Sequence, residues 1–366
     1  MKIENELLLD FSDVLLKPKR SELASRKDVK LTRTFEFKYS REQITCCPII
    51  SANMTGIATP KMASTLSKFQ MLCSTLKFDD SRELGRFASE TRNDYLETYH
   101  IIDEDSAVVN PDLHVIPTIG LDYNLDNLDY DGATPWIMLD CANGYTSRFY
   151  SQIQKMRTHE ATKRKIIIAG NVATGDATAQ AILAGADAVK IGIGPGAVCT
   201  TREVAGVGIP QLSAIAECSD VAHGLGAHII ADGGITCPGD IAKAFGAGAD
   251  FVMIGSLFAG HSEGLHSVDD EVISNESGQF IKFHGMSSKA AQEAGGGTMP
   301  EYRSSEGREV LMPYKGSVVS TIKHILGGLR SSCTYIGAKS IKDLPKCATF
   351  VRCSNILNRS LAKYEV

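Results

Sequence analysis

The chain has 366 residues, of which 43% are hydrophobic and 22% charged, an ordinary composition for a folded protein with one large core. Its 38 basic and 43 acidic side chains leave a net charge of −5, which does not favour a nucleic acid or an anionic lipid surface as partner. Neither a signal-peptide pattern nor an apolar run of roughly 20 residues is present, so we expect a cytoplasmic protein with neither nucleic acid nor membrane as partner.

Eight short runs of apolar and β-branched residues recur between helical stretches. Their continuous apolar character is typical of strands buried on both faces of a parallel sheet, and eight is the strand number of an α/β barrel. In chain order the predicted strands are Pro48–Ala52, Met71–Thr75, Val115–Ile119, Trp136–Asp140, Lys165–Gly170, Ala188–Gly192, His228–Asp232 and Phe251–Gly255. Start signals between them predict helices, among others at Lys61–Phe69, Thr174–Leu183 and Asp240–Phe245.

The stretch Ala184–Gly192 returns, with few changes, as Ala247–Gly255. Each copy follows a predicted strand and helix, so the chain carries two adjacent βαβ units of one design. This repeat favours a (β/α)8 TIM barrel, with residues 1–366 as a single catalytic domain; a doubly wound open sheet is the alternative. After the eighth strand the pattern is polar and irregular from about 261 to 312. We predict an active-site flap there, with a disordered excursion as the alternative.

Active sites of such barrels lie where the strands end. The sixth predicted strand ends in Gly192-Ile193-Gly194-Pro195-Gly196-Ala197-Val198-Cys199-Thr200-Thr201-Arg202. The glycines allow a sharp turn and place the thiol of Cys199 on a polar loop near the positively charged Arg202. Cys199 is therefore a candidate nucleophile, with an inert loop thiol as the alternative.

Four other strand ends carry polar or glycine residues. Glycines after the last two strands, at Gly233, Gly234 and Gly255, are where these barrels bind phosphate, and Asp232 is suited to ribose hydroxyls; tight turns without a ligand are the alternative. Asp140 and Lys77 can hold a second ligand, or can pair with each other. No Gly-x-Gly-x-x-Gly follows a strand, so any nicotinamide cofactor is expected to bind in another way.

Several long motifs resemble those of the IMP dehydrogenase and GMP reductase superfamily, and the resemblance covers nearly the whole chain. They are Phe11–Pro18, Gly194–Arg202 with Gly206–Gln211, Ala231–Gly234, Gly285–Ser288 and Leu326–Ser331. Three features favour the reductase branch. The chain has no room for the paired CBS modules of the dehydrogenases, it lacks their Arg-Tyr pair between 285 and 306, and Cys199–Gly208 reads as the reductase form of the loop. A dehydrogenase without CBS modules, converting IMP and NAD to XMP, and a catalytically silent nucleotide-binding barrel are the alternatives.

The resemblance implies an NADPH-dependent reduction of GMP to IMP and ammonia. Cys199 attacks C2 of the purine to form a covalent thioimidate, and hydride from NADPH releases IMP. Thr201 backed by Glu306 is the family's acid/base pair for the departing amine. The implied catalytic residues are Cys199, Thr201, Glu306, Lys77 and Asp140.

The same resemblance assigns ligand contacts residue by residue. The implied GMP contacts are Asp232, Gly233, Gly234, Gly255, Ser256, Gly285, Met286, Ser287, Arg303 and Gly307. The implied cofactor contacts are Lys77, Asp140, Cys141, Ala142, Ser331, Ser332, Cys333 and Thr334, with Ser25 and Arg26 supplied by a neighbouring subunit of a homo-oligomer, expected to be a tetramer. The implied ligands of a monovalent cation such as potassium are the backbone carbonyls of Gly194, Gly196, Cys199 and Arg202.

The chain also departs from the family pattern. Thr55 stands where reductases usually have aspartate, and Leu76 and Phe78 replace two histidines around Lys77. Ala197 replaces a serine whose hydroxyl normally helps to bind the phosphate, and His284 replaces a tyrosine. These departures bear on the affinity for GMP and on the fit of the nicotinamide.

Overall fold

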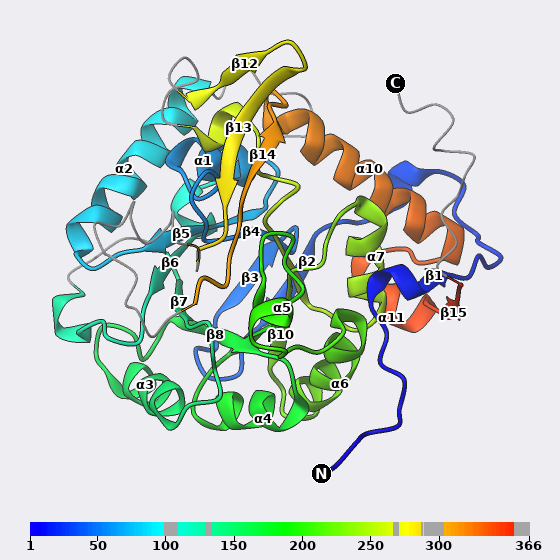
Figure 1. The fold of residues 1–366 in the computed structure, drawn as a ribbon, viewed down its shortest axis with the longest axis horizontal. Coiled ribbons are helices and arrows are strands. Elements are labelled where there is room, and N and C mark those ends of the chain that lie inside the picture. Colours follow the sequence, from blue (N-terminus) through cyan, green and yellow to red (C-terminus); the bar gives the residue numbers. More distant parts are fainter. Residues whose placement is uncertain (99–108, 129–133, 266–270, 287, 289–303, 355–366) are drawn as a thin grey trace.

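The computed structural model describes residues 1–98, 109–128, 134–265, 271–286, 288 and 304–354. Its centre is a closed barrel of parallel strands (Figure 1). The strands are β4 (Ile49–Ser51), β5 (Leu72–Lys77), β6 (Val115–Ile119), β7 (Trp136–Asp140), β8 (Ile166–Val172), β9 (Ala188–Ile191), β10 (His228–Asp232) and β11 (Phe251–Ile254). They follow one another in chain order, and β11 closes onto β4. This closure confirms the (β/α)8 barrel and excludes the open sheet.

Helices surround the barrel (Figure 1). They are α1 (Pro60–Lys68), α2 (Ser81–Thr98), α3 (Ser147–Thr158), α4 (Gly175–Leu183), α6 (Gln211–Gly224), α7 (Pro238–Gly246) and α10 (Val318–Ile336), with short helices α5 (Thr201–Val204) and α11 (Leu344–Cys347). As predicted, a proline occupies the first turn of both α1 and α7. Thr59 also caps α1 by accepting a hydrogen bond from Met62 N, whereas Thr174 precedes α4 without a side-chain capping hydrogen bond. No helix in the described ranges is long and apolar enough to cross a membrane.

A hairpin near the amino terminus fills one end of the barrel. It consists of β2 (Arg33–Glu36) and β3 (Gln43–Cys46). Phe35 stacks on Phe251 with ring centroids 4.2 Å apart, and Phe37 meets Trp136 edge to face at 5.3 Å. Because Phe251 and Trp136 begin their strands, the hairpin lies at the amino ends of the strands, and a ligand must enter from the carboxyl ends.

The segment after β11 is more regular than the sequence predicts. Its described residues form an antiparallel sheet of β12 (Ile273–Asn275), β13 (Gly278–His284) and β14 (Glu309–Pro313). In β13, Ile281 and Phe283 are buried and Lys282 between them is exposed, which is the alternation of a half-buried strand. The polar surroundings obscure this short alternation in the sequence. A further antiparallel pair, β1 (Val14–Leu16) with β15 (Phe350–Arg352), joins segments near the two termini.

Candidate active site

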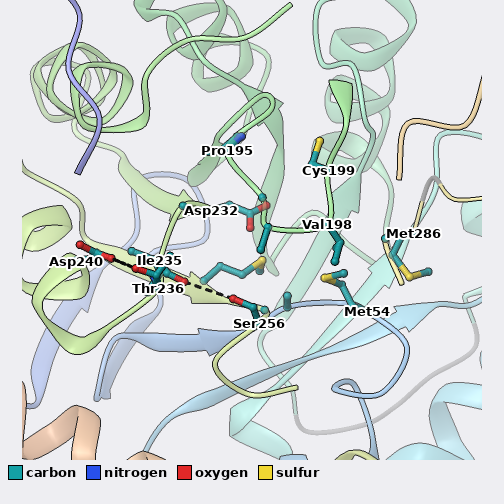
Figure 2. Close-up of a pocket in the computed structure, with 18 of the residues that line it drawn as sticks. Met54, Pro195, Val198, Cys199, Asp232, Ile235, Thr236, Asp240, Ser256 and Met286 are labelled. Atoms are coloured by element: carbon teal, nitrogen blue, oxygen red, sulfur yellow. Dashed lines mark hydrogen bonds between the residues drawn. The ribbon is translucent and has the colours of Figure 1, made fainter. Parts of the chain in front are cut away.

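A cavity of about 540 Å³ opens at the carboxyl ends of the barrel strands. Its walls come from the end of β7, from the loops after β4, β9, β10 and β11, from the turn Phe11–Asp13, and from β13 and β14 or residues next to them. Figure 2 shows side chains of these segments, including Cys199, Asp232, Ser256 and Met286, around one space. The predicted site residues that line it are Asp140, Gly196, Cys199, Arg202, Asp232, Gly233, Gly234, Gly255, Ser256, Gly285, Met286 and Glu306.

The loop that carries Cys199 depends on its first two glycines. Gly192 and Gly194 have φ of 150° and 86°, which residues with a side chain rarely adopt. A Cβ on Gly192 would lie 2.0 Å from the carbonyl oxygen of Asp232, so the loop after β9 runs directly against the end of β10. Gly196, by contrast, has no positive φ and contacts Cys199 instead.

A backbone ladder fixes the Cys199 loop to the segment before β14. Thr200 N donates to the carbonyl of Glu306 at 3.1 Å, Arg308 N donates to the carbonyl of Val198 at 3.1 Å, and Cys199 faces Gly307 between them. A Cβ on Gly307 would lie 2.9 Å from Ser288 N, so only glycine fits there. The ladder therefore brings Glu306, more than a hundred residues away in sequence, onto the loop of the candidate nucleophile.

Three of the predicted catalytic side chains form a continuous chain of contacts. Cys199 Sγ lies 3.2 Å from Thr201 Oγ1, and Thr201 Oγ1 donates to Glu306 Oε2 at 2.8 Å. The threonine hydroxyl has one proton, which goes to the carboxylate, so its oxygen is left to accept from the Cys199 thiol. The arrangement can pass a proton between the reacting sulfur and a carboxylate through one hydroxyl.

A second cluster joins the predicted cofactor and substrate residues. Lys77 Nζ lies 2.9 Å from Asp140 Oδ2, so these two residues do pair, and Lys77 is the last residue of β5 rather than following the strand. Lys190 Nζ lies 3.0 Å from Asp140 Oδ1 and 2.8 Å from Asp232 Oδ2. Asn171 Nδ2 also donates to Asp232 Oδ2, at 2.9 Å.

The charges of this cluster stabilise one another. Burial alone would raise the pKa of Asp140, but Lys190 and Lys77 hold it well below its ordinary value. Burial alone would lower the pKa of Lys190, but Asp232 and Asp140 hold it above its ordinary value. Sequence reasoning missed both Lys190 and Asn171. The signal available for Lys190 is a lysine within an otherwise apolar strand.

The loops after β10 and β11 form the corner predicted for phosphate. Gly233 and Gly234 have φ of 93° and 80°, and Thr236 follows them with its hydroxyl donating to Asp240 Oδ2 at 2.7 Å. Ser256 Oγ lies 3.5 Å from the carbonyl of Ile235, a weak contact that leaves the hydroxyl available to a ligand. Figure 2 shows Ser256 and Thr236 on the same side of the cavity.

The predicted cofactor residues do not all come together within one chain. Asp140 lines the cavity, with Cys141 and Ala142 directly after it. Ser331, Ser332 and Thr334 lie on α10, which packs against the turn Arg26–Asp28. The cavity formed by the described residues is not lined by these three residues of α10, nor by Ser25 or Arg26.

The remaining predicted contacts involve one residue of α10, two positions near β13 and β14, and the carbonyls of the Cys199 loop. Cys333, predicted to contact the cofactor, lies on the core-facing side of α10 with its side chain fully buried, which raises the pKa of its thiol to about 12. The predicted contact therefore falls to its backbone. Ser287 and Arg303 lie outside the described residues. The carbonyls predicted to bind a cation lie on one loop, where Gly194 packs against Arg202 and Gly196 against Cys199.

Comparison with known proteins agrees with this geometry. Residues 125–359 match the model of the IMP dehydrogenase / GMP reductase domain. The chain belongs to this family. It is 46% identical over 357 residues to a protein of Aeromonas hydrophila named GMP reductase, covering 96% of both chains. It is 45% identical over 365 residues to a GMP reductase of Caenorhabditis elegans, covering 100% of this chain and 97% of the relative.

Proposed function

We propose that the protein is a GMP reductase that uses NADPH to convert GMP to IMP and ammonia. The observation that carries the proposal is the chain of contacts from Cys199 through Thr201 to Glu306 on the wall of the cavity. The names of relatives that cover almost the whole chain support the reductase over the dehydrogenase.

The reaction uses Cys199 as the nucleophile. A bond forms between Cys199 Sγ and C2 of the purine, the bond from C2 to the exocyclic amine breaks, and the amine takes up a proton to leave as ammonia. Thr201 is placed to deliver that proton because its hydroxyl lies between the sulfur and the Glu306 carboxylate. Covalent attachment separates the loss of the amine from the reduction.

The nucleotide extends from Cys199 toward the β10 and β11 loops. Asp232 lines the cavity and accepts hydrogen bonds from ribose hydroxyls. Gly233, Gly234, Gly255 and Ser256 present backbone N–H groups to the phosphate, with Gly285, Met286, Ser287, Arg303 and Gly307 closing over the base. The residues drawn in Figure 2 leave a space from Cys199 to Ser256 for such a ligand.

The residues beside the cavity fit a nicotinamide cofactor. Asp140 supplies a carboxylate acceptor at the cavity wall, and the half-exposed Lys77 ammonium is a donor next to it. A nicotinamide held by these residues would supply hydride for the reduction. The rest of the cofactor contacts Ser331, Ser332, Thr334 and the backbone of Cys333, and a neighbouring subunit of a homotetramer supplies Ser25 and Arg26.

A monovalent cation such as potassium fits the Cys199 loop. The carbonyls of Gly194, Gly196, Cys199 and Arg202 are hard oxygen ligands of the kind such cations prefer. No group of histidine, cysteine or carboxylate side chains in the described part of the chain forms a metal site. Bound there, the cation would hold the loop in the shape that presents Cys199.

Two assays test the proposed function. Incubating the protein with GMP and NADPH should consume NADPH and release ammonia in equal amounts, whereas IMP with NAD should give no XMP. The reverse result would make the protein a dehydrogenase. Activity in neither assay, with GMP still bound, would favour a silent nucleotide-binding barrel.

A mixing experiment tests the contribution of a second subunit. Arg26→Ala and Cys199→Ser should each be inactive alone, and co-expression of the two variants should restore part of the activity, because some sites combine an intact Cys199 with an intact Arg26. Lys27→Ala, an equally exposed neighbour, is the matched control and should remain active. No recovery in mixed oligomers would place the whole cofactor site within one chain.

A further inference from the structure

Among the described residues, Lys190 alone forms ion pairs with both Asp140 and Asp232. Its ammonium contacts the carboxylates of both Asp140 and Asp232, at 3.0 and 2.8 Å, and its side chain is only 4% exposed. Asp140 stands on the cofactor side of the proposed site and Asp232 on the substrate side. One buried cation therefore holds an acceptor for each ligand.

The two carboxylates are occupied differently. Both oxygens of Asp140 are paired, Oδ1 with Lys190 and Oδ2 with Lys77. On Asp232, Lys190 and Asn171 share Oδ2, and no donor from the described residues contacts Oδ1. Lys190 thus fixes the orientation of Asp232 while leaving one oxygen available to a hydroxyl in the cavity.

The internal repeat shows that the fold does not require a lysine at this position. Ala184–Gly192 aligns with Ala247–Gly255, and Lys190 aligns with Met253. Met253 is 1% exposed, packs among the apolar residues inside the barrel and also lines the cavity. An unbranched apolar side chain therefore satisfies the equivalent barrel position, and the charge of Lys190 needs another explanation.

We propose that Lys190 is a positioning residue that orients the substrate-binding and cofactor-binding carboxylates together, so that losing its charge weakens the binding of both ligands. The proposal rests on the proposed function for the identity of those ligands. A residue that only stabilised the fold would not need to affect ligand binding, whereas this role requires that the affinities for GMP and for the cofactor fall together when the charge is lost. A residue that contacts only one of the two carboxylates should affect the binding of only the corresponding ligand.

The structure provides a variant for each one-sided case. Asn171 contacts Asp232 and the carbonyl of Gly192 but not Asp140, so Asn171→Ala should weaken GMP binding alone. Lys77 contacts Asp140 but not Asp232, so Lys77→Met should weaken cofactor binding alone. Lys190→Met places the repeat's own residue at this position and should weaken both.

Calorimetric titrations measure these effects without turnover. GMP and NADP are each titrated alone into the parent and variant proteins. For Lys190→Met we expect about a tenfold or greater rise in both dissociation constants, the size of losing a hydrogen bond to a charged group. Lys190→Arg keeps the charge and should restore most of both affinities, and kinetics on the variants should show KM rising for both substrates.

A buried lysine outside the site controls for general destabilisation. Lys68 on α1 is 1% exposed and contacts Thr98 and the ring of Tyr95, with no carboxylate of the site nearby. Lys68→Met should lower stability but leave both dissociation constants unchanged. Should Lys190→Met fail to fold, Lys190→Gln takes its place in the titrations.

Two results would overturn the role of Lys190: a loss of affinity for one ligand only, or unchanged affinity for both in a folded neutral variant. A protein that binds both ligands but does not consume NADPH with GMP would contradict the proposed function, and the titrations would still test Lys190.

Discussion

The two ends of the barrel use buried aspartates in different ways. At the amino ends of the strands, Asp187 and Asp250 precede β9 and β11 and are at most 1% exposed. Their oxygens are taken up by partners from the chain itself. At the carboxyl ends, Asp140 and Asp232 line a cavity, and Asp232 keeps an oxygen without a donor from the described residues. The aspartates at the amino ends are enclosed by the chain, whereas those at the carboxyl ends reach the cavity, where Asp232 keeps one oxygen for a ligand.

Asp187 and Asp250 occupy equivalent positions in the two copies of the internal repeat, Ala184–Gly192 and Ala247–Gly255. Asp187 accepts from Ile167 N, and Asp250 accepts from Ile229 N, the equivalent residue of the other unit. Beyond that shared contact the partners differ. Asp187 pairs with Arg157 at 2.5 Å, whereas Asp250 pairs with Arg33 at 3.0 Å and with His223 at 2.8 Å. At the opposite ends of the same strands, the two copies carry Lys190 and Met253.

The largest effect on chemistry should come from Cys199→Ser. Turnover should be lost, because the nucleophile is removed, while the dissociation constant of GMP changes by less than about tenfold. The melting temperature should stay close to that of the parent, since Cys199 is a half-buried loop residue and not part of the core. Turnover near the parent rate would rule out covalent catalysis, and a large loss of stability would contradict the division between the two ends.

A smaller loss, limited to one chemical step, is expected for Glu306→Gln. The amide keeps the contact with Thr201 but cannot exchange a proton as a carboxylate does, so release of ammonia should slow by about 100-fold or more. The reverse hydride step, from IMP and NADP, should slow far less. Single-turnover absorbance separates the two steps. Equal losses in both would mean that Glu306 mainly positions the substrate.

At the stabilising end, Asp250→Asn should lower stability rather than chemistry. Leaving Arg33 and two histidines without their carboxylate should cost about 3 kcal/mol of unfolding free energy. The hydrogen bond that His223 donates to the Asp250 carboxylate, with the attraction between the two charges, raises the pKa of His223 above its ordinary value. A raised pKa stabilises the fold below the unfolded value near 6.5, and this contribution is lost as pH rises through the folded value. The cost of the substitution should therefore shrink as pH rises from about 6.5 into the alkaline range.

Asp187→Asn is the matched control, because the repeat offers the same position with a different partner. Arg157 stays charged throughout this pH range, so the cost of Asp187→Asn should be the same at both ends of it. Chemical denaturation of both variants at several pH values provides the measurement. A pH-independent cost for Asp250→Asn would show that Arg33, and not His223, provides most of its stabilisation.

The barrel could be predicted from the sequence because its strands are continuous apolar runs. Val115–Ile119, Trp136–Asp140 and His228–Asp232 match the observed strands end to end. The sheet after β11 was missed because its strands are short and lie among polar residues. The glycine-rich loop alone made Cys199 a candidate nucleophile, whereas Thr201 and Glu306 were predicted through the family resemblance. Only the fold shows that a backbone ladder brings Glu306 to the Cys199 loop.

Lys190 was not predicted for a physical reason. A strand pattern records which residues are apolar, and one lysine in such a run does not reveal its partners. Asp140 and Asp232 are fifty residues away on one side and forty-two on the other, and the barrel's curvature brings all three together. The contrast with Met253 in the repeat was available in the sequence, but it gains meaning only when both positions are seen in the barrel.

The smallest expected effect concerns the phosphate. Ala197 lines the cavity at a position where the family resemblance leads us to expect a serine. Its carbonyl is already held by Arg308 Nη2 at 2.8 Å, so Ala197→Ser would add a hydroxyl without moving the loop. A hydroxyl donating to a phosphate dianion contributes about 1.5–3 kcal/mol. The substitution should tighten GMP several-fold and leave the hydride step unchanged, because the phosphate is held alike in ground and transition states. If Ser256 already supplies that contact, Ala197→Ser will change little and Ser256→Gly will weaken GMP. A calorimetric titration in which neither substitution moves the dissociation constant would show that the phosphate lies elsewhere.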